Sequence, residues 1–322
     1  MRNFKRTFFV VIILIFCVAV TNVANYVIIP YSYARITMHN IASEEHDILY
    51  VGSSHGLCGI DPDIVEENTG ESGINLCFGG EYLRDSYYMV KEAASHHTPK
   101  KIVYELDPGY WVSPENQNGD FGRLYYEMPL SKTKCQYFFA KMLDADFRTI
   151  IFPWYNYRSQ LLRIKDTVKI KGSQEYDEYD PAYFNDIVES YRKSGMIYRN
   201  RIEGEKSFDN FVLWDEKNIQ EISKTYFEKL KVFCDEKGIE LIVITTPIPR
   251  ETQEMYEQQY ADADQYFRTY FEKQKVEYYN FNYMDLGGFN RALSEFADGE
   301  GHMYGDTAEK FSGILANTLK NQ

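Results

Sequence analysis

The chain has 322 residues, of which 44% are hydrophobic and 26% are charged, and its formal net charge is −13. This composition excludes a polytopic membrane protein, a disordered chain and a collagen-like chain, and the length is sufficient for a full hydrophobic core. The acidic charge argues against a nucleic-acid partner, because it would repel the phosphate backbone. Aromatic residues make up 16% of the chain, with 28 Tyr, so their distribution along the sequence needs an explanation.

The N-terminus departs from this average. Three basic side chains (Arg2, Lys5 and Arg6) precede an almost uninterrupted apolar run over residues 8–29. A helix of this length spans roughly 33 Å, which is enough to cross a bilayer. Basic residues stay on the cytoplasmic side of such a segment, so the chain that follows would be exported. A cleaved signal peptide is the alternative, but the sequence lacks a good cleavage site after the apolar run, and an uncleaved anchor is favoured.

The expected organisation is a tail, an anchor and one exported domain. We expect a cytoplasmic basic tail at 1–7, a transmembrane signal anchor at 8–29, a connector at 30–46 and an extracytoplasmic domain at 47–322. The predicted location is the cell membrane, with a single pass and the C-terminal domain outside the cytoplasm. Because the tail contributes three positive charges, the remainder carries −16.

The five cysteines indicate neither a disulfide scaffold nor a metal site. Cys17 lies in the apolar run, and Cys58, Cys77, Cys135 and Cys234 lack metal-ligand spacing. A bridge between Cys58 and Cys77 is conceivable, but buried free thiols are favoured. We expect no metal and no cofactor.

Short apolar runs alternate with segments of helical spacing in two parts of the chain. Strands are predicted at 47–51, 73–78, 101–106, 239–245 and 276–281. Helices are predicted at 60–69, 82–95, 218–237, 250–273 and 307–320. Nearly all-apolar strands with short connections favour a mainly parallel sheet covered on both faces. Together with the right-handed crossover rule, this predicts an α/β fold, a flavodoxin-like three-layer sandwich.

An aromatic-rich segment at about 110–215 interrupts this alternation. We expect it to be an insertion that lies over the carboxyl edge of the sheet and is not a separate domain. Tyr and Trp faces stack on sugar rings, so the segment suits a carbohydrate acceptor. An ordinary aromatic packing layer explains it equally well.

Two loops at the carboxyl ends of predicted strands carry groups for nucleophilic catalysis. Ser54 lies in a turn of small residues, where a hydroxyl and backbone N–H groups can face one point. His302 lies beside Asp298 and Glu300, as a general base and its orienting acid require. Either residue alone is more often structural, but both are predicted at edges of one sheet. His55 is predicted to be a poor base, because neighbouring side chains point apart in most turns.

These loops carry a resemblance to the SGNH/GDSL hydrolases. Residues 49–54 resemble the first family block, in which Gly-Asp-Ser or Gly-Ser-Ser follows the first strand, and Ser54 takes the place of the nucleophile. Residues 75–80 resemble the second block, which implies an oxyanion N–H from Gly80, with Gly79 as the near alternative. Residues 298–304 resemble the final Asp-x-x-His block. The resemblance covers about 47–107 and 218–320 and leaves the aromatic segment uncovered.

The sequence departs from the family pattern at two places. The acid normally lies three residues before the histidine, but that residue is Gly299, so Asp298 is favoured as the acid and Glu300 is the alternative. The third block normally supplies an asparagine, which the loop at 105–109 lacks. The oxyanion hole would then rest on the N–H groups of Ser54 and Gly80. Because one lost donor can cost about 10²–10³ in rate, a catalytically impaired relative remains an alternative.

The resemblance implies a membrane-anchored, extracytoplasmic serine esterase or O-acyltransferase. A member with an anchor and Gly-Ser-Ser is similar to proteins that handle acyl groups on cell-wall polymers, such as the D-alanyl-lipoteichoic acid proteins. The implied substrate is a cell-envelope polysaccharide or teichoic acid, and an integral-membrane acyl donor protein is an expected partner. The alternative is an impaired relative that binds envelope glycan or a membrane acyltransferase partner.

Overall fold

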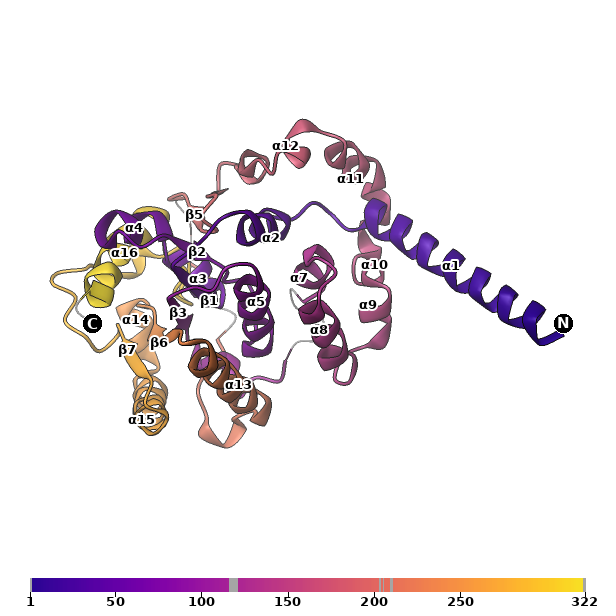
Figure 1. Ribbon diagram of the computed structural model, residues 1–322. Coiled ribbons are helices and arrows are strands. Elements are labelled where there is room, and N and C mark those ends of the chain that lie inside the picture. The colour runs from indigo at the N-terminus through magenta and orange to yellow at the C-terminus, as the bar shows by residue number, and fades with distance from the viewer. Residues whose placement is uncertain (1, 116–120, 203, 205, 209–210, 321–322) are drawn as a thin grey trace.

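The computed structural model describes residues 2–115, 121–202, 204, 206–208 and 211–320. Its centre is a parallel sheet of five strands in the order β2-β1-β3-β6-β7 (Figure 1). The first strand lies between the second and the third, which is the flavodoxin-like order, so the predicted fold class is confirmed. The strands are β1 (Ile48–Gly52), β2 (Gly73–Asn75), β3 (Lys101–Glu105), β6 (Glu240–Thr245) and β7 (Glu277–Asn280).

Alternate residues of the strands enter two separate cores. In β1, Leu49 and Val51 pack into the core on one face, while Ile48 and Tyr50 pack into the core on the other. Because side chains alternate along a strand, an all-apolar strand must be covered on both faces. The first face is covered by α5 (Leu83–His96), α13 (Glu221–Lys237) and α15 (Glu257–Gln274). The second is covered by α3 (Ser54–Gly59), α4 (Pro62–Thr69) and α16 (Gly305–Lys320) (Figure 1).

Local sequence signals explain where several elements begin and end. Asp61 caps α4 by accepting a hydrogen bond from the backbone of Asp63, and Pro62 occupies the first turn. Gly238 ends α13 with φ +69°, a conformation that glycine adopts at little cost. The second strand is shorter than predicted, because the Asn75 side chain bonds the backbone of Gly56, Ile60 and Cys77 and turns the chain.

Three further elements differ from the predictions. The expected connector contains α2 (Ala34–Ser43), whose Ile36 is fully buried. The expected helix at 250–273 is two helices, α14 (Arg250–Met255) and α15, separated by the non-helical backbone of Tyr256. A short turn, η3 (Glu216–Asn218), precedes α13, which therefore begins three residues later than predicted.

The N-terminal helix α1 (Arg2–Ile28) extends away from the rest of the chain (Figure 1). Residues 4–28 are long and apolar enough to cross a membrane, by length and composition alone. The last turns of α1 contact the rest of the described chain: Asn25 and Ile28 are buried, whereas the preceding apolar residues are exposed.

Most of the aromatic segment does not lie over the carboxyl edge of the sheet as expected, although residues near its two ends, such as Tyr110 and Phe211, reach this edge. Its helices between residues 121 and 171 pack beyond α5, next to the end of α1 (Figure 1). They pack there because buried Tyr137 stacks on Tyr88 of α5, and α7 packs on α2. The helices of the segment are α6 (Pro108–Val112), α7 (Phe121–Glu127), α8 (Lys132–Met142), α9 (Phe147–Ile151), α10 (Pro153–Asn156), η1 (Arg158–Arg163), α11 (Ile164–Lys171), α12 (Gln174–Asp177) and η2 (Pro181–Phe184). A hairpin follows, β4 (Glu189–Tyr191) and β5 (Ile197–Arg199).

We predict that Gly52→Ala destabilises the fold by about 3 kcal/mol. Gly52 has φ +148°, and a Cβ there would lie 2.4 Å from the Glu105 carbonyl oxygen. The measurement is thermal unfolding in detergent. Gly313→Ala in α16 is the matched control, because its Cβ meets open space and alanine favours a helix by roughly 0.5–1 kcal/mol. Equal melting temperatures for the two variants would contradict the prediction.

Candidate active site

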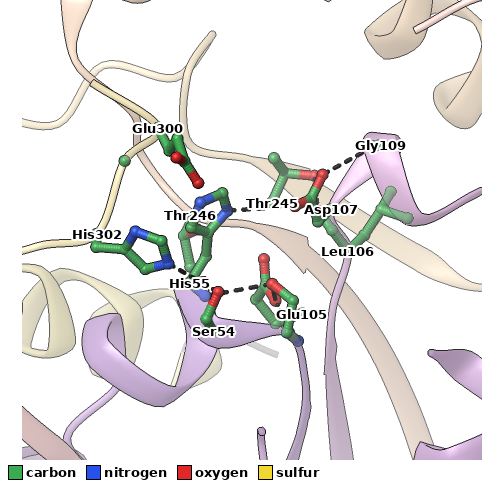
Figure 2. A network of polar contacts seen from close by, with 12 residues as sticks. Ser54, His55, Glu105, Leu106, Asp107, Gly109, Thr245, Thr246, Glu300 and His302 are labelled. Atoms are coloured by element: carbon green, nitrogen blue, oxygen red, sulfur yellow. Dashed lines mark hydrogen bonds and ion pairs between the residues drawn. The ribbon is translucent and has the colours of Figure 1, made fainter. Parts of the chain in front are cut away.

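The end of β1 places Ser54 at the carboxyl edge of the sheet. Ser53 caps α3 by accepting a hydrogen bond from the His55 N–H. The Ser53 N–H and hydroxyl both donate to Oε2 of Glu105, each at 2.9 Å. Glu105 is fully buried, and burial raises its pKa. Ser54 is thus the first residue of α3, and its hydroxyl faces the loop that precedes α16 (Figure 2).

That loop completes a continuous chain of hydrogen bonds. Oγ of Ser54 lies 2.7 Å from Nε2 of His302, and Nδ1 of His302 lies 2.7 Å from Oδ2 of Asp298. The loop is closed on itself, because the Ala297 N–H donates to the His302 carbonyl at 2.7 Å. The structure therefore brings together the three residues that the sequence nominated as nucleophile, base and favoured acid.

The surroundings of Asp298 keep it ionised. Burial raises its pKa, but the His302 hydrogen bond and charge and the backbone donors outweigh burial and lower the pKa to about 2. Oδ1 accepts the N–H groups of Glu300, Gly301 and His302 at 3.1–3.2 Å. Nη1 of Arg199 lies 3.6 Å from Oδ2. A fixed carboxylate at this position holds the imidazole in one orientation.

The loop conformation holds Asp298, four residues before His302, against the imidazole. At Gly299, where the family pattern would place the acid, a Cβ would lie 2.5 Å from the ring of Phe208. Gly301 has φ +122°, and its Cβ would meet Ile248 at 2.8 Å. Glu300, the alternative acid, lines the adjoining pocket (Figure 2), and the carboxylate that contacts Nδ1 of His302 is that of Asp298.

A pocket of about 180 Å³ opens beside Ser54. Aromatic rings and polar groups both line it, and among the described residues of the aromatic segment those that reach it lie near its two ends. The lining residues are Ser54, His55, Tyr82, Asp107, Gly109, Tyr110, Ser113, Phe211, Val212, Tyr260 and Glu300.

The sequence did not predict His55 and Asp107 as members of this pocket. Nδ1 of His55 lies 3.6 Å from Oδ2 of Asp107, and the His55 and His302 rings are 4.9 Å apart (Figure 2). Asp107 also caps α6 through the Gly109 N–H at 2.8 Å. The sequence feature that could have predicted Asp107 as a pocket residue is its position directly after β3, at the edge where the carboxyl ends of the strands meet.

Gly79 and Gly80 form a turn after β2, and Gly80 has φ +72°. Burial raises the pKa of the Tyr110 hydroxyl, which lies near this turn. Neither glycine is among the residues that line the pocket in the described part of the chain. Their predicted part in an oxyanion hole therefore stays a prediction.

The cysteines are free thiols, and Cys58 and Cys77 are buried as favoured from the sequence. Over the described residues, no group of three or more His, Cys, Asp or Glu side chains is arranged to hold a metal ion.

No protein-family model and no curated protein matches the sequence. Among solved structures, the chain is similar to a proposed acylhydrolase from Bacteroides fragilis, with 9% identity and a TM-score of 0.42 over 90% of this chain and 98% of the other. It is also similar to a GDSL-like lipase from Bacteroides thetaiotaomicron, with 8% identity and a TM-score of 0.41 over the same shares of the two chains. Similarity at this level carries no argument about function. The function proposed below is argued from the geometry of the site.

We predict that the stability contributed by Asp298 is lost on acidification. Its pKa is lowered in the folded chain, so the contribution is present above the ordinary aspartate pKa of about 4 and disappears as the pH falls toward 2. The difference in melting temperature between wild type and Asp298→Asn should therefore shrink between about pH 5 and pH 2. A difference that stays constant over this range would show that the carboxylate is not stabilised by its surroundings.

Proposed function

We propose that the protein is a membrane-anchored, extracytoplasmic serine esterase or O-acyltransferase that acts on acyl groups of a cell-envelope polysaccharide or teichoic acid. The observation that carries the proposal is the hydrogen-bonded chain from Ser54 through His302 to Asp298. A serine hydroxyl is a weak nucleophile until an adjacent base accepts its proton, and this arrangement supplies that base.

In the proposed reaction, Oγ of Ser54 attacks the acyl carbonyl carbon while Nε2 of His302 accepts the hydroxyl proton. Asp298 keeps the imidazole oriented through Nδ1 and stabilises its positive charge. The N–H groups of Ser54 and Gly80 are proposed to hold the oxyanion. His302 then gives its proton to the leaving alcohol, and the acyl group passes from Ser54 to water or to another hydroxyl.

The pocket lining supports a polar substrate such as a sugar or polyol ester. Three tyrosine rings, those of Tyr82, Tyr110 and Tyr260, lie among the lining side chains with His55 and two carboxyl groups. Tyrosine offers an apolar face to a sugar ring and a hydroxyl to its oxygens, and the carboxyl groups add acceptors. A long alkyl chain would gain little from such a lining.

The apolar helix α1 supports the membrane part of the proposal. With the basic residues of its N-terminus on the cytoplasmic side, α1 would hold the catalytic domain at the outer surface, where envelope polymers are found. An integral-membrane protein that supplies the acyl group is proposed as a partner.

One observation favours a catalytically impaired relative as the second candidate. The loop at 105–109, which follows β3, lacks the asparagine of the family pattern. Such a protein would bind envelope glycan or a membrane acyltransferase partner through the same pocket.

We predict that a serine-reactive fluorophosphonate labels the full-length protein at Ser54. Ser54→Ala should abolish labelling, and His302→Ala should slow it by about 10²–10⁴-fold, because the base is lost. Ser113→Ala is the matched control. Ser113 lines the same pocket, but its hydroxyl donates to the Gly109 carbonyl and has no histidine partner, so labelling should persist.

Equal labelling of wild type and Ser54→Ala would overturn the proposed nucleophile. A folded wild type that is not labelled, hydrolyses no acyl ester and binds envelope glycan equally well with and without Ser54→Ala would instead establish the impaired relative.

We predict that removing the charge of Asp298 lowers kcat much more than removing the charge of Glu300. Asp298→Asn should lower kcat for an acetyl ester by about 10³–10⁴-fold, because the imidazole loses the acceptor at Nδ1. Glu300→Gln changes a carboxyl group of similar position that lies outside the hydrogen-bonded chain, and should alter kcat less than about 10-fold. The reverse ranking would make Glu300 the acid.

A further inference from the structure

Exposed apolar side chains gather on one part of the aromatic segment. Outside α1, half of the exposed large hydrophobic residues of the described chain lie within residues 130–171, which we call the α8–α11 module. Leu162 is 98% exposed and Leu143 is 81% exposed. The full set is Leu130, Phe139, Leu143, Phe147, Ile151, Leu161, Leu162 and Val168. Apolar exposure gathered in this way marks an interaction surface.

The module is also basic in an acidic chain. Residues 130–171 hold nine Lys and Arg residues against three Asp, a net charge of +6, whereas the whole chain carries −13. Basic and apolar side chains on short helices, interleaved with Trp and Tyr, are the composition of segments that lie in a membrane interface. Arg148 and Arg158 both lie over the ring of Tyr155, at 5.0 and 4.6 Å.

Contacts with α1 place this module next to the point where the helix leaves the protein. The Trp154 N–H donates to Oδ1 of Asn25 at 3.0 Å, and Nζ of Lys171 donates to the carbonyl of Tyr26 at 2.8 Å. The elements α10, η1 and α11 all contact α1, and Figure 1 shows α1 projecting from them. Because the exposed apolar part of α1 ends where these contacts begin, a bilayer that surrounds α1 must reach the module.

We propose that the α8–α11 module is a membrane-interface surface that inserts its apolar side chains among the headgroups of an anionic bilayer. The inference rests on the proposed anchoring of the chain by α1. The occupant is a lipid surface, because the module is continuous with the apolar helix and its charge is complementary to acidic headgroups. Anchor and module together would hold the catalytic domain in one orientation above the membrane.

The test uses the full chain in vesicles that contain anionic lipid, with an environment-sensitive fluorophore on single cysteines. Cys17 and Cys135 are the exposed thiols and are replaced by serine, while the other three stay buried. Phe147→Cys reports on the module, and Met255→Cys, on the catalytic domain, is its control with matched exposure, 58% against 59% in wild type. Leu162→Cys provides a second position in the module.

Lipids that carry a quencher near the headgroup should quench the fluorophore at residues 147 and 162 at least threefold more than at residue 255. The difference should decrease when zwitterionic lipid replaces anionic lipid. Quenching at 147 and 162 no greater than at 255 would overturn the proposal. A fluorophore that is shielded from water but not quenched by lipid would also overturn it, in favour of a protein partner or a second copy.

A separate variant distinguishes failure of the proposal for the module from failure of the proposed anchoring by α1. It retains Cys17, which lies exposed near the middle of α1, as the labelled thiol, and for this variant the quencher is carried in the lipid acyl chains, because Cys17 would lie below the headgroups. Quenching at Cys17 without quenching at 147 and 162 rejects the module alone, whereas no quenching at Cys17 rejects the proposed anchoring.

Discussion

The geometry of the site depends on the close approach of β1 and β3 at their carboxyl ends. Gly52 lies opposite Glu105 in the register, and space for a side chain is absent there. This approach lets the buried Glu105 carboxyl group accept both hydrogen bonds of Ser53, which fixes the cap of α3. Ser54 follows directly, so its hydroxyl is positioned by backbone that cannot move without breaking a buried contact. Such support is what a preorganised nucleophile requires.

The repeating part of the fold was predictable because its signal is local. Apolar runs of strand length between helical segments predict a parallel sheet in any context, and the five strands lie where they were expected. The aromatic segment was not placed correctly, because its position depends on contacts such as that of Tyr137 with Tyr88, which no periodicity reveals. The extra helix α2 was missed for the same reason, since its burial is created by packing on distant elements.

In the site, the sequence nominated residue types and positions but not the shape of the loops. Spacing alone left Asp298 and Glu300 open, because the choice depends on how the loop folds, and the loop brings Oδ2 of Asp298 to 2.7 Å from Nδ1 of His302. His55 was predicted to be a poor base, because neighbouring side chains point apart in most turns. Its side chain lines the same pocket as Ser54, with Nδ1 3.6 Å from Oδ2 of Asp107, and the sequence does not reveal this contact between two loops.

The uneven charge of the chain indicates which part of the protein an anionic membrane would attract and which part it would repel. With +6 in the α8–α11 module, the rest of the chain carries −19. A single membrane helix leaves the exported domain free to rotate about the helix axis, and a second contact beside the helix removes that freedom. An anionic surface attracts the module and repels the acidic body, but screening confines both effects to about 8 Å at physiological salt. The module must therefore touch the headgroups to hold the domain, which is what its exposed apolar side chains would achieve.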